Sequence, residues 1–326
     1  MVLAEQTQDE IFEASLRSQL ELIDAALLRA AEADSEMVTE AAQHIIAAGG
    51  KRFRPLLVVL GSYLGPREAT EDVVKAAVVV ELTHVASLYH DDVMDEAGIR
   101  RGSPSANSRW GNTVAILVGD LLFARASDIV CDLGPEFVRL QARTFSRLVQ
   151  GQIAETVGPS ETDPLDHYLQ VVADKTGSLI ATSALFGSKI SNAAPQLQRV
   201  MAEFGEQIGI VFQLSDDIID ITSDQTGKTP GTDLREGIPT LPTLLARRSD
   251  DPADVRLLQL LNSDLHDDGA LHEVLDLLRR HPCIDQAREE VRRRANAARA
   301  LLDPLPIGAA RDALDDLCTT VVTRTA

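Results

Sequence analysis

The sequence predicts an all-α protein that forms one domain over residues 1–326. Three observations support this fold class. The chain is rich in Ala, Leu, Glu and Arg and has only 4% aromatic residues. Strand-like alternation between turn dipeptides is hard to find. No linker is long or polar enough to divide the chain, and 44% hydrophobic residues are enough for a substantial core.

Helix boundaries follow capping residues and Gly or Pro breaks. In the clearest case Thr70 can cap, Glu71 and Asp72 suit the positive end of a first turn, and no Gly or Pro follows before Gly98. A second long helix begins after Pro195 and continues through Ile221. The other predicted helices span Gln8–Ala33, Ser35–Ala48, Thr113–Leu133, Glu136–Thr156, Pro164–Gly187, Leu241–Arg247, Pro252–Leu261, Leu271–Arg280 and Ile284–Leu302.

Composition excludes several classes of function. The formal net charge of −19 argues against nucleic-acid binding, which needs a basic face. Three widely spaced cysteines indicate neither a disulfide framework nor a zinc site, which fits a reducing, cytoplasmic location. An acidic N-terminus does not resemble a targeting peptide. The longest apolar runs meet Glu81 and Asp120, so no integral membrane segment is expected.

Two clusters of aspartates have the same spacing. "LYHDDVMDEAGIRRG" (88–102) and "QLSDDIIDI" (213–221) both place two adjacent aspartates three residues before a third. Residues i and i+4 lie about 40° apart on a helix, so the first and last aspartate of each cluster share a face. A single acidic cluster is more often solvated surface. Two such clusters in otherwise apolar helices indicate metal binding instead.

The ligand set favours magnesium. Oxygen ligands without a partner His or Cys disfavour zinc, and the spacing does not match an EF-hand. Mg²⁺ takes one or two carboxylates and completes its octahedron with water and substrate phosphates. Basic residues gather at two breaks, "GGKRFRP" (49–55) and "IRRG" (99–102), where arginine forks could bind phosphate oxygens.

These residues resemble the trans-type (all-E) isoprenyl diphosphate synthases, the polyprenyl synthetase family. The resemblance runs from about residue 45 to residue 245, and its motifs recur in family order. They are "GGKRFRP", "HVASLYHDDVMD" with the following arginines, "GNTVAILVGDLLFA", "DKTGSL", "FQLSDDIID" and "GKTPGTDLREGIPTLP". The resemblance implies a helical bundle around a central cavity (the isoprenoid synthase fold), a homodimer, and head-to-tail condensation of isopentenyl diphosphate with an allylic diphosphate.

The same resemblance implies roles for individual residues. Up to three Mg²⁺ ions would be bound by the two aspartate clusters: Asp91, Asp92, Asp95, Asp216, Asp217 and Asp220. The allylic diphosphate would be bound by Arg100, Lys175 and Lys228, and isopentenyl diphosphate by Lys51, Arg54, His84 and Arg101. The carbocation would be stabilised by Thr176, Gln213 and Phe212. Ile238 stands where the family often has a lysine, which removes one cation directed at diphosphate.

Product length depends on the bulk upstream of Asp91. Ala86, Ser87 and Thr83 are all small, which disfavours the short C15–C20 product that an aromatic floor gives. A long-chain product of the kind used for quinone side chains, made from a farnesyl or geranylgeranyl primer, is therefore expected. Four alternatives stay open: a short-chain synthase, a class I terpene cyclase, a non-catalytic subunit of a two-component synthase, and a metal-dependent binding protein.

Overall fold

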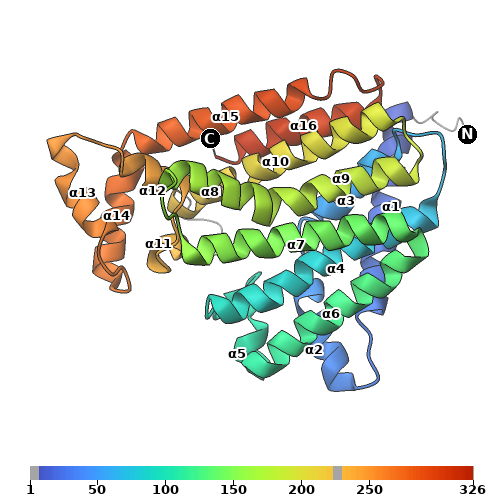
Figure 1. The fold of residues 1–326 in the computed structure, drawn as a ribbon, viewed down its shortest axis with the longest axis horizontal. Coiled ribbons are helices and arrows are strands. Elements are labelled where there is room, and N and C mark those ends of the chain that lie inside the picture. Colours follow the sequence, from blue (N-terminus) through green and yellow to red (C-terminus); the bar gives the residue numbers. More distant parts are fainter. Residues whose placement is uncertain (1–6, 223–229, 326) are drawn as a thin grey trace, which may run out of the picture. The chain divides into compact units, whose positions relative to one another are not determined.

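A computed structural model describes residues 7–222 and 230–325 of the 326-residue chain. These residues are helical almost throughout (Figure 1), which confirms the predicted all-α class. The helices are α1 (Gln8–Ala30), α2 (Glu36–Ala47), α3 (Phe53–Ser62), α4 (Thr70–Met94), α5 (Ala106–Trp110), α6 (Asn112–Leu133), α7 (Pro135–Val157), α8 (Pro164–Val172), α9 (Ser178–Ile190), α10 (Pro195–Thr222), α11 (Thr232–Arg235), α12 (Leu241–Ala246), α13 (Val255–Leu261), α14 (Asp268–Arg280), α15 (Cys283–Ala300) and α16 (Ala309–Thr323).

Shorter elements interrupt this series. A π-helical turn, Ala173–Gly177, joins α8 to α9, and a 3₁₀ turn, Pro252–Asp254, precedes α13. Two short strands, β1 (Ile99–Arg100) and β2 (Ser103–Pro104), pair antiparallel just after α4.

Backbone contacts divide the chain into two compact units. Unit 1 comprises Met1–Ser146, Leu179–Gly205 and Pro304–Leu314, and unit 2 comprises Arg147–Ser178, Glu206–Asp303 and Asp315–Ala326. The prediction of one domain over the whole chain stays a prediction.

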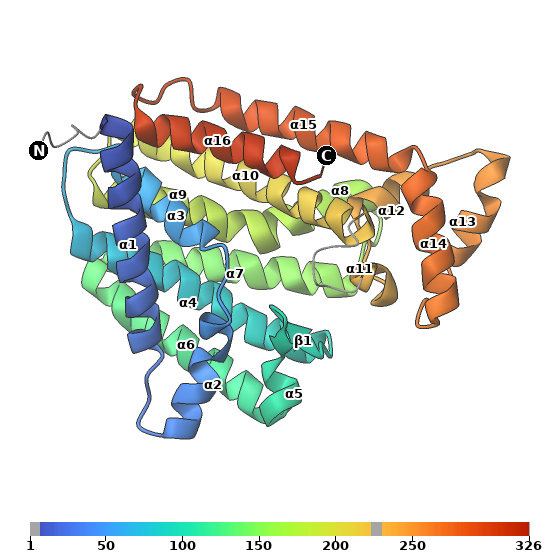
Figure 2. The ribbon, with the colours of Figure 1, turned by 180° about the vertical axis from the view of Figure 1, so that it is seen from behind.

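Helix α4 is the core of unit 1. It packs against α1, α3 and α6, and Figure 2 shows α1 lying across it. Because it has neighbours on several sides, it is apolar around much of its circumference, including the consecutive buried residues Val78, Val79 and Val80. Within the described residues α4 alone is long and apolar enough to cross a membrane. Its most apolar stretch is 67% buried, as in the central helix of a globular fold.

Helices α3 and α9 approach each other closely within unit 1. A Cβ added at Gly187 would lie 1.9 Å from the carbonyl oxygen of Val58, and one added at Gly61 would lie 2.7 Å from that of Ala184. Both positions therefore require glycine for packing, whatever their backbone dihedrals.

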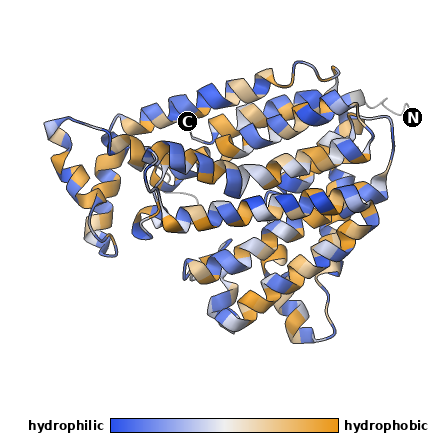
Figure 3. Ribbon diagram, in the orientation of Figure 1, coloured by the Kyte–Doolittle hydropathy of each residue, from blue (hydrophilic) through white to orange (hydrophobic). Residues whose placement is uncertain are grey.

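Unit 2 contains a smaller core between α12, α13 and α14. Figure 3 shows hydrophilic and hydrophobic residues interleaved along α13 and α14. On α14 the buried residues Leu271, Val274, Leu275 and Leu278 follow helical spacing, so one face packs inward.

Several predicted boundaries were wrong, and each error has a local cause. α3 was not predicted, although its Pro55 lies in the first turn, where proline is tolerated. The helix predicted to reach Gly98 ends at Met94, because Glu96 adopts φ 49°. α5 and α16 were not predicted. The helix expected to end at Gly187 continues to Ile190.

The contact between α3 and α9 gives a stability prediction. Gly187→Ala should lower the free energy of unfolding by about 1–3 kcal/mol or more, because the added methyl group overpacks backbone that cannot move aside easily. The measurement is the urea midpoint. Gly98→Ala is the matched control, since nothing lies within 4 Å of its added Cβ. Equal midpoints for the two variants would contradict the close approach.

Candidate active site

The first aspartate cluster lies at the carboxyl end of α4. The backbone N–H of Asp95 donates to the carbonyl oxygen of Asp91 at 2.8 Å, so helical spacing continues to the last aspartate of the cluster. Both side chains are half-buried. The structure thus gives Asp91 and Asp95 the shared face that their spacing predicts.

The middle aspartate of this cluster has a different environment. Asp92 is fully buried, and Arg100 binds its Oδ1 through Nε at 2.6 Å and Nη2 at 2.5 Å. Burial raises the pKa of Asp92, while the charge of Arg100 opposes that shift. The arginine predicted to bind allylic diphosphate is therefore paired with a carboxylate, and that ion pair fixes the segment after α4.

In the second cluster, on α10, the middle aspartate is again the buried one. Asp217 is buried and accepts hydrogen bonds from the Tyr168 hydroxyl, from the Leu241 N–H at 3.0 Å and from Gln213 Nε2 at 3.2 Å. Burial is the main cause that raises the pKa of Asp217 to about 6. Asp217 thus binds three protein groups, and its predicted role as a metal ligand stays a prediction.

The two outer aspartates of this cluster also have partners. Asp216 Oδ1 accepts a hydrogen bond from Arg324 at 2.5 Å. The carboxylate of Asp220 accepts from the backbone N–H groups of Thr232 and Asp233, both at 3.3 Å, and so holds the first turn of α11.

A hydrogen-bond chain connects the predicted carbocation-stabilising residues. Thr176 Oγ1 donates to Gln213 Oε1 at 3.3 Å, and Gln213 then donates to Asp217. The structure therefore brings Thr176 and Gln213 together within unit 2. The guanidinium of Arg324 lies 4.8 Å from the ring centroid of Phe212, the third residue of that predicted group.

Lys175 lies in the π-helical turn. The turn interrupts the regular helix between α8 and α9. The ammonium group is 2.5 Å from Glu155 Oε2, and the side chain is only 27% exposed. Asp174, its neighbour in the turn, binds Arg147, which also binds Glu206. Sequence reasoning missed these three residues.

A half-buried basic cluster lies beside the first aspartate motif in unit 1. Burial lowers the pKa of Arg54 to about 10, and its Nε has no hydrogen-bond partner among the described residues. Arg101 donates to the carbonyl oxygens of Ile45, at 2.9 Å, and Gly49. Burial and then the nearby arginines, Arg54 first, lower the pKa of His84 well below 6.5, so its ring is neutral at pH 7. This cluster contains three of the four residues predicted to bind isopentenyl diphosphate, and the fourth, Lys51, is exposed.

Two residues that sequence reasoning left without a role support this cluster. Arg52 adopts a left-handed conformation, φ 47° and ψ 37°, and binds both Asp24 at 2.6 Å and Glu81 at 3.1 Å. Glu81 is 2% exposed and supplies the buried negative charge that several arginines need. A glutamate inside the valine-rich stretch of α4 was the sequence signal that could have identified it.

The three residues predicted to control product length differ in environment. Ala86 and Thr83 are completely buried, whereas Ser87 is half-buried. Ser87 is also four residues before Asp91 and so lies on the same face of α4. Ser87 therefore shares a partly exposed face of α4 with Asp91, whereas Ala86 is enclosed.

The loop after the second motif is described only in part. Lys228 lies outside the described residues. Ile238 is half-buried, and its N–H donates to the carbonyl oxygen of Asp233 at 2.8 Å, which closes the turn after α11.

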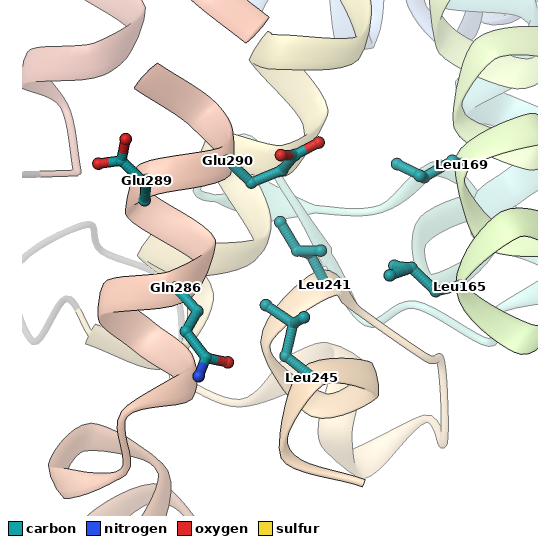
Figure 4. Close-up of a pocket in the computed structure, with 7 residues that line it drawn as sticks. All are labelled: Leu165, Leu169, Leu241, Leu245, Gln286, Glu289 and Glu290. Carbon is teal, nitrogen blue, oxygen red and sulfur yellow. The ribbon is translucent and has the colours of Figure 1, made fainter. Parts of the chain in front are cut away.

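A separate pocket of about 390 Å³ lies in unit 2 between α8, α12 and α15 (Figure 4). Its apolar wall is formed by leucines of α8 and α12, and its other side by Gln286, Glu289 and Glu290. Among the described residues, none of the predicted site residues lines it. Leu241, which lines the pocket, donates its N–H to Asp217.

The donor set fits a hard divalent cation. Both clusters offer only carboxylate oxygens, and Asp92 Oδ2 is buried without a hydrogen-bond partner in the described part of the chain. Over residues 7–222 and 230–325, no three His, Cys, Asp or Glu side chains lie close enough to hold a metal ion together. One or two carboxylates per ion, with water and phosphate as the other ligands, is the arrangement that suits Mg²⁺.

Helical fold and carboxylate clusters together define a class of all-α enzymes that handle diphosphates. The family model for polyprenyl synthetases matches residues 35–278, and the chain belongs to that family. It is 44% identical over 319 residues to a nonaprenyl diphosphate synthase of Mycobacterium tuberculosis, covering 97% of this chain and 95% of the relative. The family assignment confirms the predicted prenyltransferase and isoprenoid synthase fold.

Solved structures agree with this assignment. A geranylgeranyl pyrophosphate synthase from Corynebacterium glutamicum, described as a complex with calcium and isoprenyl diphosphate, has a TM-score of 0.87 and 43% identity, covering 98% of this chain and 99% of its own. A decaprenyl diphosphate synthase from Rhodobacter capsulatus has a TM-score of 0.88 and 30% identity, with the same coverage.

The neutral state of His84 gives a prediction. If an uncharged ring binds diphosphate, His84→Gln should keep the KM for isopentenyl diphosphate within a few-fold of wild type, because an amide also donates a neutral hydrogen bond. His84→Ala should raise that KM about tenfold or more. Steady-state kinetics at pH 7 is the measurement.

The same assignment predicts a pH dependence of stability. A lowered pKa in the folded state means that the unfolded chain binds the proton more readily below pH 6.5, so His84 destabilises the fold as pH falls through that value. His84→Gln should therefore lose less stability than wild type between pH 7 and pH 5. An equal loss would show that folding does not lower the pKa of His84.

Proposed function

We propose that the protein is a Mg²⁺-dependent synthase that condenses isopentenyl diphosphate head-to-tail with an allylic diphosphate and makes a long-chain all-trans polyprenyl diphosphate. Farnesyl or geranylgeranyl diphosphate is the proposed primer, and quinone side chains the proposed use of the product. We propose a homodimer in the cytoplasm, with a product that passes to a membrane. Relatives named nonaprenyl and decaprenyl diphosphate synthases support the long-chain assignment.

The observation that carries this proposal is the half-buried basic cluster of Arg54, His84 and Arg101. A terpene cyclase needs only one diphosphate site, so it would not need a second anion pocket. Glu81 offsets part of the positive charge, but Arg54 Nε is left without a hydrogen-bond partner among the described residues, and a diphosphate supplies acceptors for several donors at once. The cluster is therefore best explained as the isopentenyl diphosphate site.

Divalent cations have a defined place in this proposal. Asp91 and Asp95 on α4 would bind them, and so would Asp216 on α10, with up to three Mg²⁺ ions in all. When bound, these ions act as Lewis acids that stabilise the negative charge of the departing diphosphate. Asp92 and Asp217 hold the metal-binding aspartates in place from buried, hydrogen-bonded positions.

The remaining residues act on the substrates. The allylic C–O bond breaks to give diphosphate and a carbocation, which is attacked by the double bond of isopentenyl diphosphate. Lys175 is 2.5 Å from Glu155 and would turn to the allylic diphosphate, together with Lys228. Thr176 and Gln213 present neutral oxygens to the carbocation, because a charged base there would quench it. Released diphosphate accepts the proton, so no side-chain base is required.

A short-chain synthase is the second candidate. The 43% identity to a geranylgeranyl pyrophosphate synthase favours it. Incubation of the protein with labelled isopentenyl diphosphate and each primer, followed by chromatography of the dephosphorylated products, distinguishes the two. Products longer than geranylgeraniol support the main proposal, and accumulation of geranylgeraniol supports the second. No incorporation with any primer would refute both.

Metal binding by the aspartate clusters gives a further prediction. Asp91→Ala and Asp216→Ala should each lower kcat by several orders of magnitude, because each removes a metal ligand needed in the transition state. Circular dichroism should show an unchanged helical fold, since removal of one of several repelling charges relieves the helix. Glu289→Ala is the control, since Glu289 is an exposed residue whose described ion pair is with Arg292 on the same helix, α15. Near-normal turnover of either aspartate variant would contradict the assignment.

The position of Ser87 gives a product-length prediction. Ser87→Phe should shorten the product and leave the melting temperature close to wild type, because Ser87 is half-buried and not enclosed by the core. Ala86→Phe should lower the stability by about 1–3 kcal/mol, since its side chain is completely enclosed. Product chromatography and thermal melts are the measurements. Unchanged product length in Ser87→Phe would remove this residue from the path of the chain.

A further inference from the structure

We propose that Arg324, near the C-terminus, is a positioning residue of the metal site. Its guanidinium neutralises Asp216 in the ligand-free protein and leaves that carboxylate when a divalent cation binds. The inference rests on the proposed function, in which Asp216 is a metal ligand.

The contacts of Arg324 carry this proposal. Its Nη2 is 2.5 Å from Asp216 Oδ1, and its guanidinium lies over the ring of Phe212 at 4.8 Å. A cation is needed at both places during the reaction: a metal ion at Asp216 and a carbocation near Phe212. Arg324 therefore supplies positive charge, in the ligand-free protein, at the two positions where the substrates and ions supply it later.

The rest of the C-terminal segment holds this arginine in place. Ser215, next to Asp216, donates from Oγ to the carbonyl oxygen of Val321 at 2.8 Å. Arg288 on α15 donates from Nε to the carbonyl oxygen of Thr325, also at 2.8 Å. Val321 and Thr325 are 3% and 4% exposed. These hydrogen bonds fix the backbone before and after Arg324, so its contact with Asp216 is held in place by the surrounding structure.

One nitrogen of Arg324 lacks a hydrogen-bond acceptor among the described residues while the side chain is paired with Asp216, a state called docked below. Arg324 Nη1 is buried and has no hydrogen-bond partner anywhere in residues 7–222 and 230–325. An unsatisfied buried donor weakens the docked state relative to a state in which that donor is paired. The side chain of Asp216 is 40% exposed, so an ion can reach the carboxylate from solvent. Both features make the ion pair exchangeable.

Competition follows from the ligand chemistry. Asp216 Oδ1 cannot accept a 2.5 Å hydrogen bond from a guanidinium and also coordinate a cation in the same direction. A divalent cation repels the guanidinium as well, so binding of the ion displaces Arg324. The free energy of the ion pair is then subtracted from that of metal binding, and loss of Arg324 should make metal binding tighter.

The experiment measures the Mg²⁺ concentration that half-saturates the complex with inorganic diphosphate, by calorimetry on the full-length protein. Arg324→Gln should lower this concentration about 3- to 10-fold, the range for a partly exposed ion pair. Arg324→Lys keeps the positive charge and should stay close to wild type. Arg293→Gln makes the same change in net charge at a surface residue that binds Glu290, and it should have no effect.

A double variant identifies Asp216 as the site of competition. Asp216→Asn alone should raise the Mg²⁺ requirement, and adding Arg324→Gln to it should change nothing further. If Asp216→Asn leaves the requirement unchanged, the metal assignment of the proposed function fails. If Asp216→Asn raises it but Arg324→Gln leaves it unchanged or raises it, the competition alone is refuted.

Hydrogen exchange tests the same idea without a substitution. Wild-type amides of residues 315–326 should exchange faster when Mg²⁺ and diphosphate are both present, since release of Arg324 removes one anchor of the segment. This measurement also decides the matter if Arg324→Gln does not fold. Exchange that is unchanged or slower with both ligands would overturn the proposal.

Discussion

Repulsion between adjacent carboxylates is the constraint on which this site depends. Three aspartates within five residues of a helix repel one another, and both clusters reduce that cost in the same way. The middle aspartate turns into the protein, where Arg100 neutralises Asp92 and three hydrogen-bond donors hold Asp217. The outer aspartates are half-buried. Turning one carboxylate inward thus lowers the repulsion between the other two, and the partners of the buried carboxylate also fix the chain next to each cluster.

The sequence was sufficient to predict those parts of the site that depend on local spacing. Helical geometry alone predicts that Asp91 and Asp95 share a face. The sequence pattern also predicts the two long helices, α4 and α10, that carry the clusters. Partners far along the chain could not be predicted, because spacing within one helix says nothing about them. Arg324 meets Asp216 across 108 residues, and Glu81 meets Arg52 across 29.

Helix α16, which was not predicted from the sequence, has a related explanation. The segment that forms α16 contains Thr and Val residues of modest helix propensity, so its local preference is weak. Leu314, Cys318 and Val321 are buried at helical spacing, and the tertiary packing of that face stabilises the helix. The apolar spacing was visible in the sequence, but the packing partners of that face were not. Ala86 and Ser87 show the same limit: both are small, and only the packing of α4 reveals which one is enclosed.

The π-helical turn at Ala173–Gly177 changes which residues before and after it lie on the same face of the helix. Two ordinary α-helical turns hold about 7.2 residues, and a π turn adds about one more. Residues eight apart, which would diverge by about 80° on a regular helix, therefore come back to one face. Tyr168 and Thr176 are eight apart, and they reach Asp217 and Gln213, which are four apart on α10. One extra residue in a single turn thus lets two helices with different spacing share one hydrogen-bond network.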